Sequence, residues 1–199
     1  HMKNKILLAA AAIICITTAA TGTLAYFTSE DTAHNVITSG GVNIEVVEKT
    51  RDGDGVLVDF PEEGITGVMP GTDVSKLVSV ENTGASETWI RVRVEAGIKG
   101  ADGADLPLTI DGDVPVMTYE VGRNWSLSED GYYYYALPVT PGESTELLFD
   151  TVSFAPEMGN EYQDCTANIV ISAQAVQTAN NGQTVLEAQG WSENEEVAR

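Results

Sequence analysis

The sequence predicts an all-β protein, folded as an antiparallel β-sandwich of about seven to nine strands. Short runs rich in Val, Ile, Thr and aromatic residues alternate with Gly, Pro, Asn and Asp along the chain after residue 40. No long stretch shows the period of an amphipathic helix. The same region is long enough to bury a core without disulfides or a bound metal, so stability alone requires no cofactor.

The expected strands are separated by turns whose residues fix or permit special backbone angles, as in the Asn-Thr-Gly run at 82–84. Within 89–95, apolar side chains alternate with Arg91, Arg93 and Glu95. One face of this strand should therefore meet the core and the other solvent. The expected strands cover 42–48, 56–60, 74–81, 89–96, 116–120, 132–138, 145–154 and 166–177.

Two parts of the chain do not follow the strand pattern. Residues 97–115 are rich in Gly, Pro and Asp, and we expect a Gly/Asp-rich loop insert there with at most a short strand at 108–110. After residue 179 the apolar alternation stops and glutamates crowd the end. This indicates a frayed acidic tail over 180–199 that could include a short helix. The sandwich itself is expected over 41–179.

The first part of the chain, residues 1–25, has the pattern of a secretory signal peptide, with His1 as a cloning remnant. Two lysines precede an apolar run at 6–16, and small residues follow up to Ala25. The run is shorter than the roughly 20 residues of a membrane-spanning helix. Cleavage is expected between Ala25 and Tyr26, which predicts a secreted protein in the extracellular matrix or at the cell surface.

The chain is strongly acidic. It holds 10 Lys and Arg against 30 Asp and Glu, a formal net charge of −20. Neither signal-peptide lysine remains after cleavage, so the 174 residues that follow Ala25 carry 8 basic and 30 acidic side chains, a net charge of −22. Such a surface repels phosphate backbones and anionic lipids. We therefore expect no nucleic-acid partner, and no membrane partner after cleavage.

Cys165 is the single cysteine of the expected mature chain, because Cys15 belongs to the signal peptide. An internal disulfide is thus excluded. A buried apolar thiol is the expected state of Cys165, and an intermolecular bridge is the alternative.

Short blocks of the sequence occur in the same order in a known family. They comprise the cleavage region, a proline-glycine turn with the following strand and asparagine turn, a tyrosine run, and three later segments. In order they read GTLAYFT at 22–28, MPGTD at 69–73 with LVSVENTG at 77–84, DGYYYY at 130–135, PGEST at 141–145, LFDTV at 148–152 and ISAQAVQ at 171–177. On these blocks the chain resembles the TasA/camelysin (CalY) family of exported biofilm-matrix fibre proteins, which the signal peptidase SipW processes.

The resemblance implies a jelly-roll β-sandwich that serves as the structural subunit of an extracellular fibre. After signal cleavage the segment 26–40 would add as a strand to the neighbouring subunit, with Tyr26, Phe27, Val36 and Ile37 filling its groove. The implied partners are further copies of the chain, joined head to tail, a signal peptidase of SipW type, and accessory matrix proteins. The segment could instead fold back as the first strand of its own subunit, and the two arrangements could be successive states.

Two other functions stay open. One is a monomeric cell-surface adhesion module. The other is a camelysin-like secreted metallopeptidase, but a zinc hydrolase needs about three protein ligands, and the mature chain has one histidine, His34, and no His-Glu-x-x-His. Serine or cysteine catalysis would also depend on His34 as the sole imidazole base. We therefore expect a non-enzymatic protein with no catalytic residues and no required cofactor.

Weak calcium binding is an alternative use of one acidic loop. Asp52 and Asp54 alternate with glycines, and Asp59 follows closely. An EF-hand would need a further ligand where Val56 stands. The other interpretation is a turn that uses Asp and Gly for their backbone preferences.

Aromatic residues suggest a second candidate surface. The tyrosines at 132–135 together with Trp125 could stack on carbohydrate or form an adhesive patch. Strand alternation gives the simpler interpretation, in which two of these tyrosines face the core and two face outward.

Overall fold

The protein is built almost entirely from strands. The computed structural model describes residues 36–37 and 42–191. Its strands are β1 (Val36–Ile37), β2 (Ile44–Arg51), β3 (Leu57–Asp59), β4 (Ile65–Thr66), β5 (Asp73–Asn82), β6 (Thr88–Lys99), β7 (Thr109–Ile110), β8 (Val114–Pro115), β9 (Met117–Tyr119), β10 (Trp125–Leu127), β11 (Tyr133–Tyr135), β12 (Phe149–Phe154) and β13 (Thr166–Gln177), and a short 3-10 helix, η1 (Asn160–Tyr162), precedes β13.

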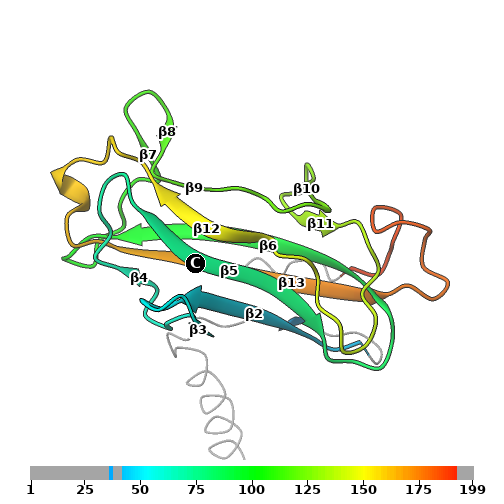
Figure 1. Ribbon diagram of the computed structural model, residues 1–199. Coiled ribbons are helices and arrows are strands. Elements are labelled where there is room, and N and C mark those ends of the chain that lie inside the picture. Colours follow the sequence, from blue (N-terminus) through cyan, green and yellow to red (C-terminus); the bar gives the residue numbers. More distant parts are fainter. Residues whose placement is uncertain (1–35, 38–41, 192–199) are drawn as a thin grey trace, which may run out of the picture. The chain divides into compact units, whose positions relative to one another are not determined.

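Two sheets pack face to face, so the predicted all-β sandwich is confirmed (Figure 1). One sheet has the order β1-β13-β6-β11-β10, with β4 also paired to β13, and the other has the order β3-β2-β5-β12-β9. Among the described strands, pairing is antiparallel except between β1 and β13. β6 and β13 pair along all twelve residues of each strand and form the longest ladder of the first sheet.

The core lies between the sheets and is filled by alternate residues of the long strands. Val78 on β5, Ile90 and Val92 on β6, and Val152 on β12 are fully buried. Burying one such side chain stabilises the fold by roughly 1.5–3 kcal/mol. The strand alternation predicted in 89–95 is thus correct for its inward face.

The predicted strands agree with the structure best where the alternation is long. The range 166–177 is the whole of β13. The short strands β4, β8 and β10 were not predicted. Strands of two or three residues are too short to show an alternating pattern. β12 begins later than expected, at Phe149, and has a register shift between Phe149 and Thr151.

The expected loop insert is smaller than 97–115. Strand β6 runs on through Lys99, because residues 97–99 continue the ladder with β13. A tight turn follows, in which the Gly100 N–H donates to the Ala104 carbonyl (2.8 Å). The insert also contains the hairpin of β7 and β8. These two strands pair with each other and form a small sheet of their own (Figure 1).

The C-terminal segment is packed on the sandwich over its described part, so the expectation of a frayed tail does not hold for residues 180–191. We call residues 178–191 the strap. Val185 and Ala188 in the strap are buried, and Trp191 packs beside them against aromatic residues of the first sheet. The physical reason is that an outward apolar face needs cover, and the strap supplies it. Residues 192–199 lie outside the described residues.

Candidate functional site

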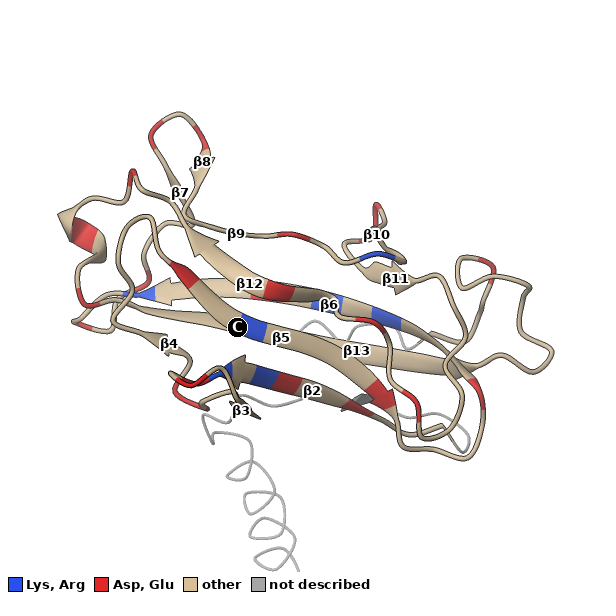
Figure 2. Ribbon diagram, in the orientation of Figure 1, with Lys and Arg blue, Asp and Glu red and all other residues tan. Residues whose placement is uncertain are grey.

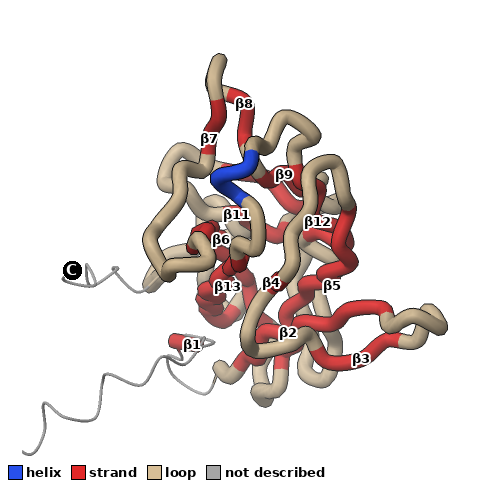
Figure 3. The backbone as a smooth tube through the Cα atoms, turned by 90° about the vertical axis from the view of Figure 1, so that its left-hand side faces the viewer, coloured by secondary structure: helices blue, strands red, loops and turns tan. Residues whose placement is uncertain are grey.

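One side of the sandwich ends on a long strand in each sheet. β13 lies near the end of the first sheet and β2 near the end of the second, and the two strands pack against each other (Figure 3). On its outer side β13 pairs with β4 at Thr166 and Ala167 and with β1 at Ala173 and Gln174. β3 covers β2 only over residues 49–51.

We call the remaining stretches, residues 168–172 of β13 and 44–48 of β2, the open edge. Within the described ranges, no strand pairs with the outer side of either stretch. Apart from Glu48, the inward side chains here are apolar, and Ile169, Ile171 and Ile44 among them are buried. A strand laid along this edge would meet backbone donors and acceptors on β13 and apolar groups between the sheets.

Part of the predicted donor segment lies at this edge. Val36 pairs with Ala173 and Ile37 with Gln174, in parallel orientation. In the single chain, β1 therefore lies on its own sheet, which is the fold-back arrangement. The other predicted residues of this region, Ala25, Tyr26, Phe27 and His34, lie outside the described residues.

The Asn-Thr-Gly turn at 82–84 holds the point from which the N-terminal segment leaves the sandwich. The buried Asn82 amide donates to the carbonyls of Ser86 and Val139, each at 2.8 Å, and its oxygen accepts the Gly84 N–H at 3.0 Å. A Cβ on Gly84 would lie 2.6 Å from the backbone nitrogen of Asn43, so only glycine fits. The Asn43 side chain in turn donates to the Thr83 hydroxyl at 2.6 Å.

Glu48, at one end of the open edge, forms an ion pair with the buried Lys76. The Lys76 side chain is 2% exposed, and its Nζ lies 2.6 Å from Glu48 Oε1 and 3.6 Å from the centre of the Phe60 ring. Burial lowers the pKa of Lys76 despite the opposing charge and hydrogen bond of Glu48. This pair was not among the residues predicted from the sequence. The signal was available, because Glu48 and Lys76 follow Val46 and precede Val78 in the inward phase of their strands.

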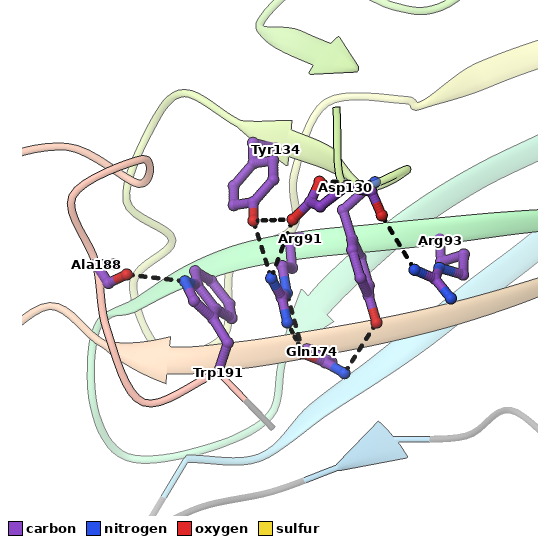
Figure 4. Close-up of polar contacts among 8 residues, drawn as sticks. Arg91, Arg93, Asp130, Tyr134, Gln174, Ala188 and Trp191 are labelled. Carbon is purple, nitrogen blue, oxygen red and sulfur yellow. Dashed lines mark hydrogen bonds and ion pairs between the residues drawn. The ribbon is translucent and has the colours of Figure 1, made fainter. Parts of the chain in front are cut away.

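A second cluster covers the outward face of the first sheet and centres on Arg91 (Figure 4). Arg91 was expected to face solvent, but it is 8% exposed. Its Nε and Nη2 donate to Gln174 Oε1 at 3.0 and 2.8 Å, and its Nη1 donates to the Tyr134 hydroxyl at 2.9 Å. The guanidinium also lies 4.0 Å from the centre of the Tyr132 ring and 4.7 Å from that of Trp191.

The tyrosine run divides between the two sides of its sheet, as alternation predicted. Tyr135 is part of the main core and Tyr133 packs against it, whereas Tyr132 and Tyr134 belong to the Arg91 cluster. The outward pair is nevertheless buried, because the strap lies over it. Trp125 is also buried in the main core, 4.9 Å from Tyr135 between ring centres. In this closed arrangement the aromatic residues form packed clusters and no exposed stacking surface.

Asp130 links the cluster to the turn before the tyrosines. It accepts hydrogen bonds from the Tyr134 hydroxyl (2.7 Å) and the Tyr132 N–H (3.1 Å). Burial by itself would raise the pKa of Asp130, but these hydrogen bonds and the charge of Arg91 hold the pKa below its ordinary value. Burial and the bond to Asp130 raise the pKa of Tyr134.

Replacing Asp130 with asparagine should make stability less sensitive to acid. Because the pKa of Asp130 is lower in the folded state, its carboxylate stabilises the fold above the unfolded pKa of about 3.9, and this contribution disappears as the pH falls through the folded pKa. The side chain is 41% exposed, so we expect a loss of at most about 1 kcal/mol at neutral pH.

Urea denaturation of Asp130→Asn and wild type at neutral and at strongly acidic pH measures this difference, which should vanish in acid. Glu129→Gln, at an exposed neighbouring position, is the matched control and should leave the acid response unchanged. An equal loss of stability at both pH values in Asp130→Asn would contradict the assignment.

The acidic loop considered for calcium is organised as a hairpin turn. Asp52 Oδ1 accepts the N–H groups of Asp54 (3.0 Å) and Val56 (2.8 Å). Asp59 lies at the other end of the hairpin and pairs with Lys49 at 2.5 Å. The structure thus does not bring Asp52, Asp54 and Asp59 together, and calcium binding stays a prediction. Over 36–37 and 42–191, no three His, Cys, Asp or Glu side chains are grouped so that they could hold a metal ion.

The distribution of charged side chains and the burial of Cys165 match the expectations from the sequence. Acidic residues are spread over the loops and both sheets (Figure 2). Lys49, Lys76, Arg91 and Lys99 each pair with an acidic side chain. Cys165 is fully buried, as expected, and burial raises the pKa of its thiol.

Two further findings concern the chain as a whole. Comparison with protein-family models and with curated proteins finds no match. In the part of the chain that the structure describes, no helix has the length and hydrophobicity needed to cross a bilayer.

Proposed function

We propose that this protein is a secreted structural subunit of an extracellular fibre, and that it polymerises by N-terminal donor-strand exchange after signal-peptide cleavage. The observation that supports the proposal is the open edge. Two long strands, β13 and β2, end the sheets on the same side of the sandwich, and within the described ranges their outer sides are only partly paired.

An edge of this kind favours the addition of a further strand. Unpaired backbone groups on an edge strand form a template for another chain, and proteins usually block it. Here the block at residues 173 and 174 is the two-residue strand β1, which belongs to the chain's own N-terminal segment. A neighbour's segment 26–40 could replace β1 and extend the pairing along 168–172. The replacement gains hydrogen bonds without unfolding the sandwich.

The contact would be heterologous, because the segment of one subunit meets the edge of the next. Repetition of a heterologous contact produces a filament. The root of the segment is held by the 82–84 turn, so the donor would leave the sandwich from a fixed point. Before cleavage the signal peptide would keep the segment at the membrane. Cleavage at Ala25 would therefore control assembly, by a peptidase of SipW type.

Electron microscopy of two purified forms tests the proposal. Protein starting at Tyr26 should form filaments as its concentration rises, whereas the same chain starting at Gly41 should stay monomeric, because it has no donor segment. Circular dichroism of the shorter form must show an intact β-fold. Calcium should be included and omitted in parallel, because the predicted Asp52 site would otherwise be left untested.

Each result decides between functions. Filaments from the shorter form would overturn donor-strand exchange. Monomers from both forms, by solution mass, would favour the adhesion module or a fibre that needs an accessory matrix protein to nucleate it. A peptide of residues 26–40 added to the shorter form should bind to it, and a peptide with Val36 and Ile37 replaced by Asp should not.

A further inference from the structure

The side chain of Asn181 joins the two ends of the strap's loop. Asn181 Nδ2 donates to the Gln189 carbonyl at 2.9 Å, and the Gln189 N–H donates back to Asn181 Oδ1 at 2.8 Å. The Asn181 carbonyl also accepts the indole N–H of Trp89 at 3.1 Å. Both halves of the side-chain amide thus join the two ends of the loop 181–189, and the backbone carbonyl of Asn181 holds the loop on β6.

The residue after Asn181 makes this amide chemically labile. Gly182 follows it, and this is the one Asn-Gly pair in the 199 residues. Asparagine is among the thermolabile residues of proteins, and a following glycine leaves the backbone nitrogen free of side-chain hindrance. The fold requires glycine here, because Gly182 has φ +76° and a Cβ would lie 3.0 Å from the Ala188 nitrogen.

We propose that Asn181 is a deamidation site and that its conversion releases the strap. The Gly182 nitrogen attacks Asn181 Cγ, a C–N bond forms, and the bond from Cγ to Nδ2 breaks. Ammonia leaves with the proton from the Gly182 nitrogen. Water then hydrolyses the resulting succinimide at either carbonyl and yields aspartate or isoaspartate. The reaction needs water alone and no oxidant or reductant.

The closed strap protects Asn181 from deamidation, and opening of the strap exposes it. In the closed strap both amide atoms are hydrogen-bonded to Gln189, so Cγ is not free to turn toward the Gly182 nitrogen. The strap packs in a small cluster separate from the main core, and such satellite regions open locally at a lower free energy than global unfolding. Deamidation would therefore shift the strap toward its open state.

The deamidated product cannot form both hydrogen bonds with Gln189 again. A carboxylate at position 181 has no hydrogen to donate to the Gln189 carbonyl, and two oxygens would face each other there. Release of the strap uncovers an aromatic face that includes Trp89, Tyr132 and Tyr134. This inference is independent of the proposed fibre assembly, since it concerns the opposite face of the first sheet from the core.

Peptide mapping by mass spectrometry tests the modification. The full chain from Tyr26 is aged at mildly alkaline pH and elevated temperature. We expect the peptide that contains Asn181 to acquire the mass of an acid in place of an amide and to split into aspartate and isoaspartate forms. The peptide with Asn160, which precedes Glu161, is the internal control and should stay unchanged. No conversion at Asn181, while a free peptide of residues 178–186 converts fully, would overturn the proposal.

Hydrogen exchange tests whether deamidation releases the strap. In Asn181→Asp, which reproduces the aspartate product, amide exchange over 178–191 should accelerate by about tenfold or more, the scale of one lost hydrogen bond. Exchange over β13 should stay as in wild type, which also shows that the variant folds. Equal protection of the strap in wild type, Asn181→Asp and the aged protein would overturn its release. Asn181→Gln keeps an amide but closes the ring far more slowly, so it should resist ageing.

Discussion

Replacing Arg91 with alanine should lower the free energy of unfolding by about 3 kcal/mol, the scale of losing one partner from a buried charged network. The guanidinium is the donor for Gln174 and Tyr134 and fills the space between the rings of Tyr132 and Trp191. Its removal leaves the Gln174 oxygen without these donors and opens a gap beneath the strap. Urea denaturation followed by tryptophan fluorescence measures the loss.

Arg93→Ala is the matched control for Arg91→Ala. Arg93 lies on the same face, stacks 4.5 Å from the Tyr132 ring centre and donates to the Asp130 carbonyl at 3.1 Å, but it is less buried. We expect its loss to cost about 1 kcal/mol or less. Arg91→Lys should not restore stability, because a point charge cannot reproduce the planar fork of the guanidinium. Equal effects of Arg91→Ala and Arg93→Ala would contradict a central role for Arg91.

Asn82→Ala should destabilise the protein by roughly 2–3 kcal/mol, since a buried backbone group left without its hydrogen bond costs about that much. Asn82 is fully buried, and its amide joins the 82–84 turn to the carbonyls of Ser86 and Val139. The variant loses three hydrogen bonds and leaves a cavity. Thermal and urea unfolding in the chain from Gly41 measure the effect in the absence of the N-terminal segment.

Thr83→Ala, at the exposed centre of the same turn, is the control for Asn82→Ala. It removes only the hydrogen bond from Asn43 and should change stability by about 0.5 kcal/mol or less. If the two variants lost equal stability, the turn would act through its exposed contact with Asn43 and not through the buried amide.

The outward side of the first sheet shows where sequence patterns stop being informative. Alternation in 89–95 correctly placed Ile90 and Val92 in the core, and it placed Arg91 on the other face. It could not show that this face is covered. The cover comes from the strap, whose Asn181 contacts Trp89 across 92 residues of sequence. A polar, glutamate-rich C-terminal sequence gave no periodic signal for this packing.

In the candidate fibre site, the donor segment is predicted from the sequence but the acceptor edge is not. The sequence and the family resemblance predict the donor segment 26–40, with Val36 and Ile37 among its apolar groups. The acceptor side could not be predicted, because every long strand carries similar alternation. Only the order of strands in the two sheets places β13 and β2 on one side of the sandwich.

Sequence patterns alone predict the all-β class, the long strands and the apolar residues on the inward faces of those strands. These follow from a two-residue period, which is a local property of the chain. Which edges stay open and the cover of the strap over Arg91 are properties of the tertiary structure. Each of these depends on contacts between segments far apart in sequence, and local alternation does not encode which segments meet.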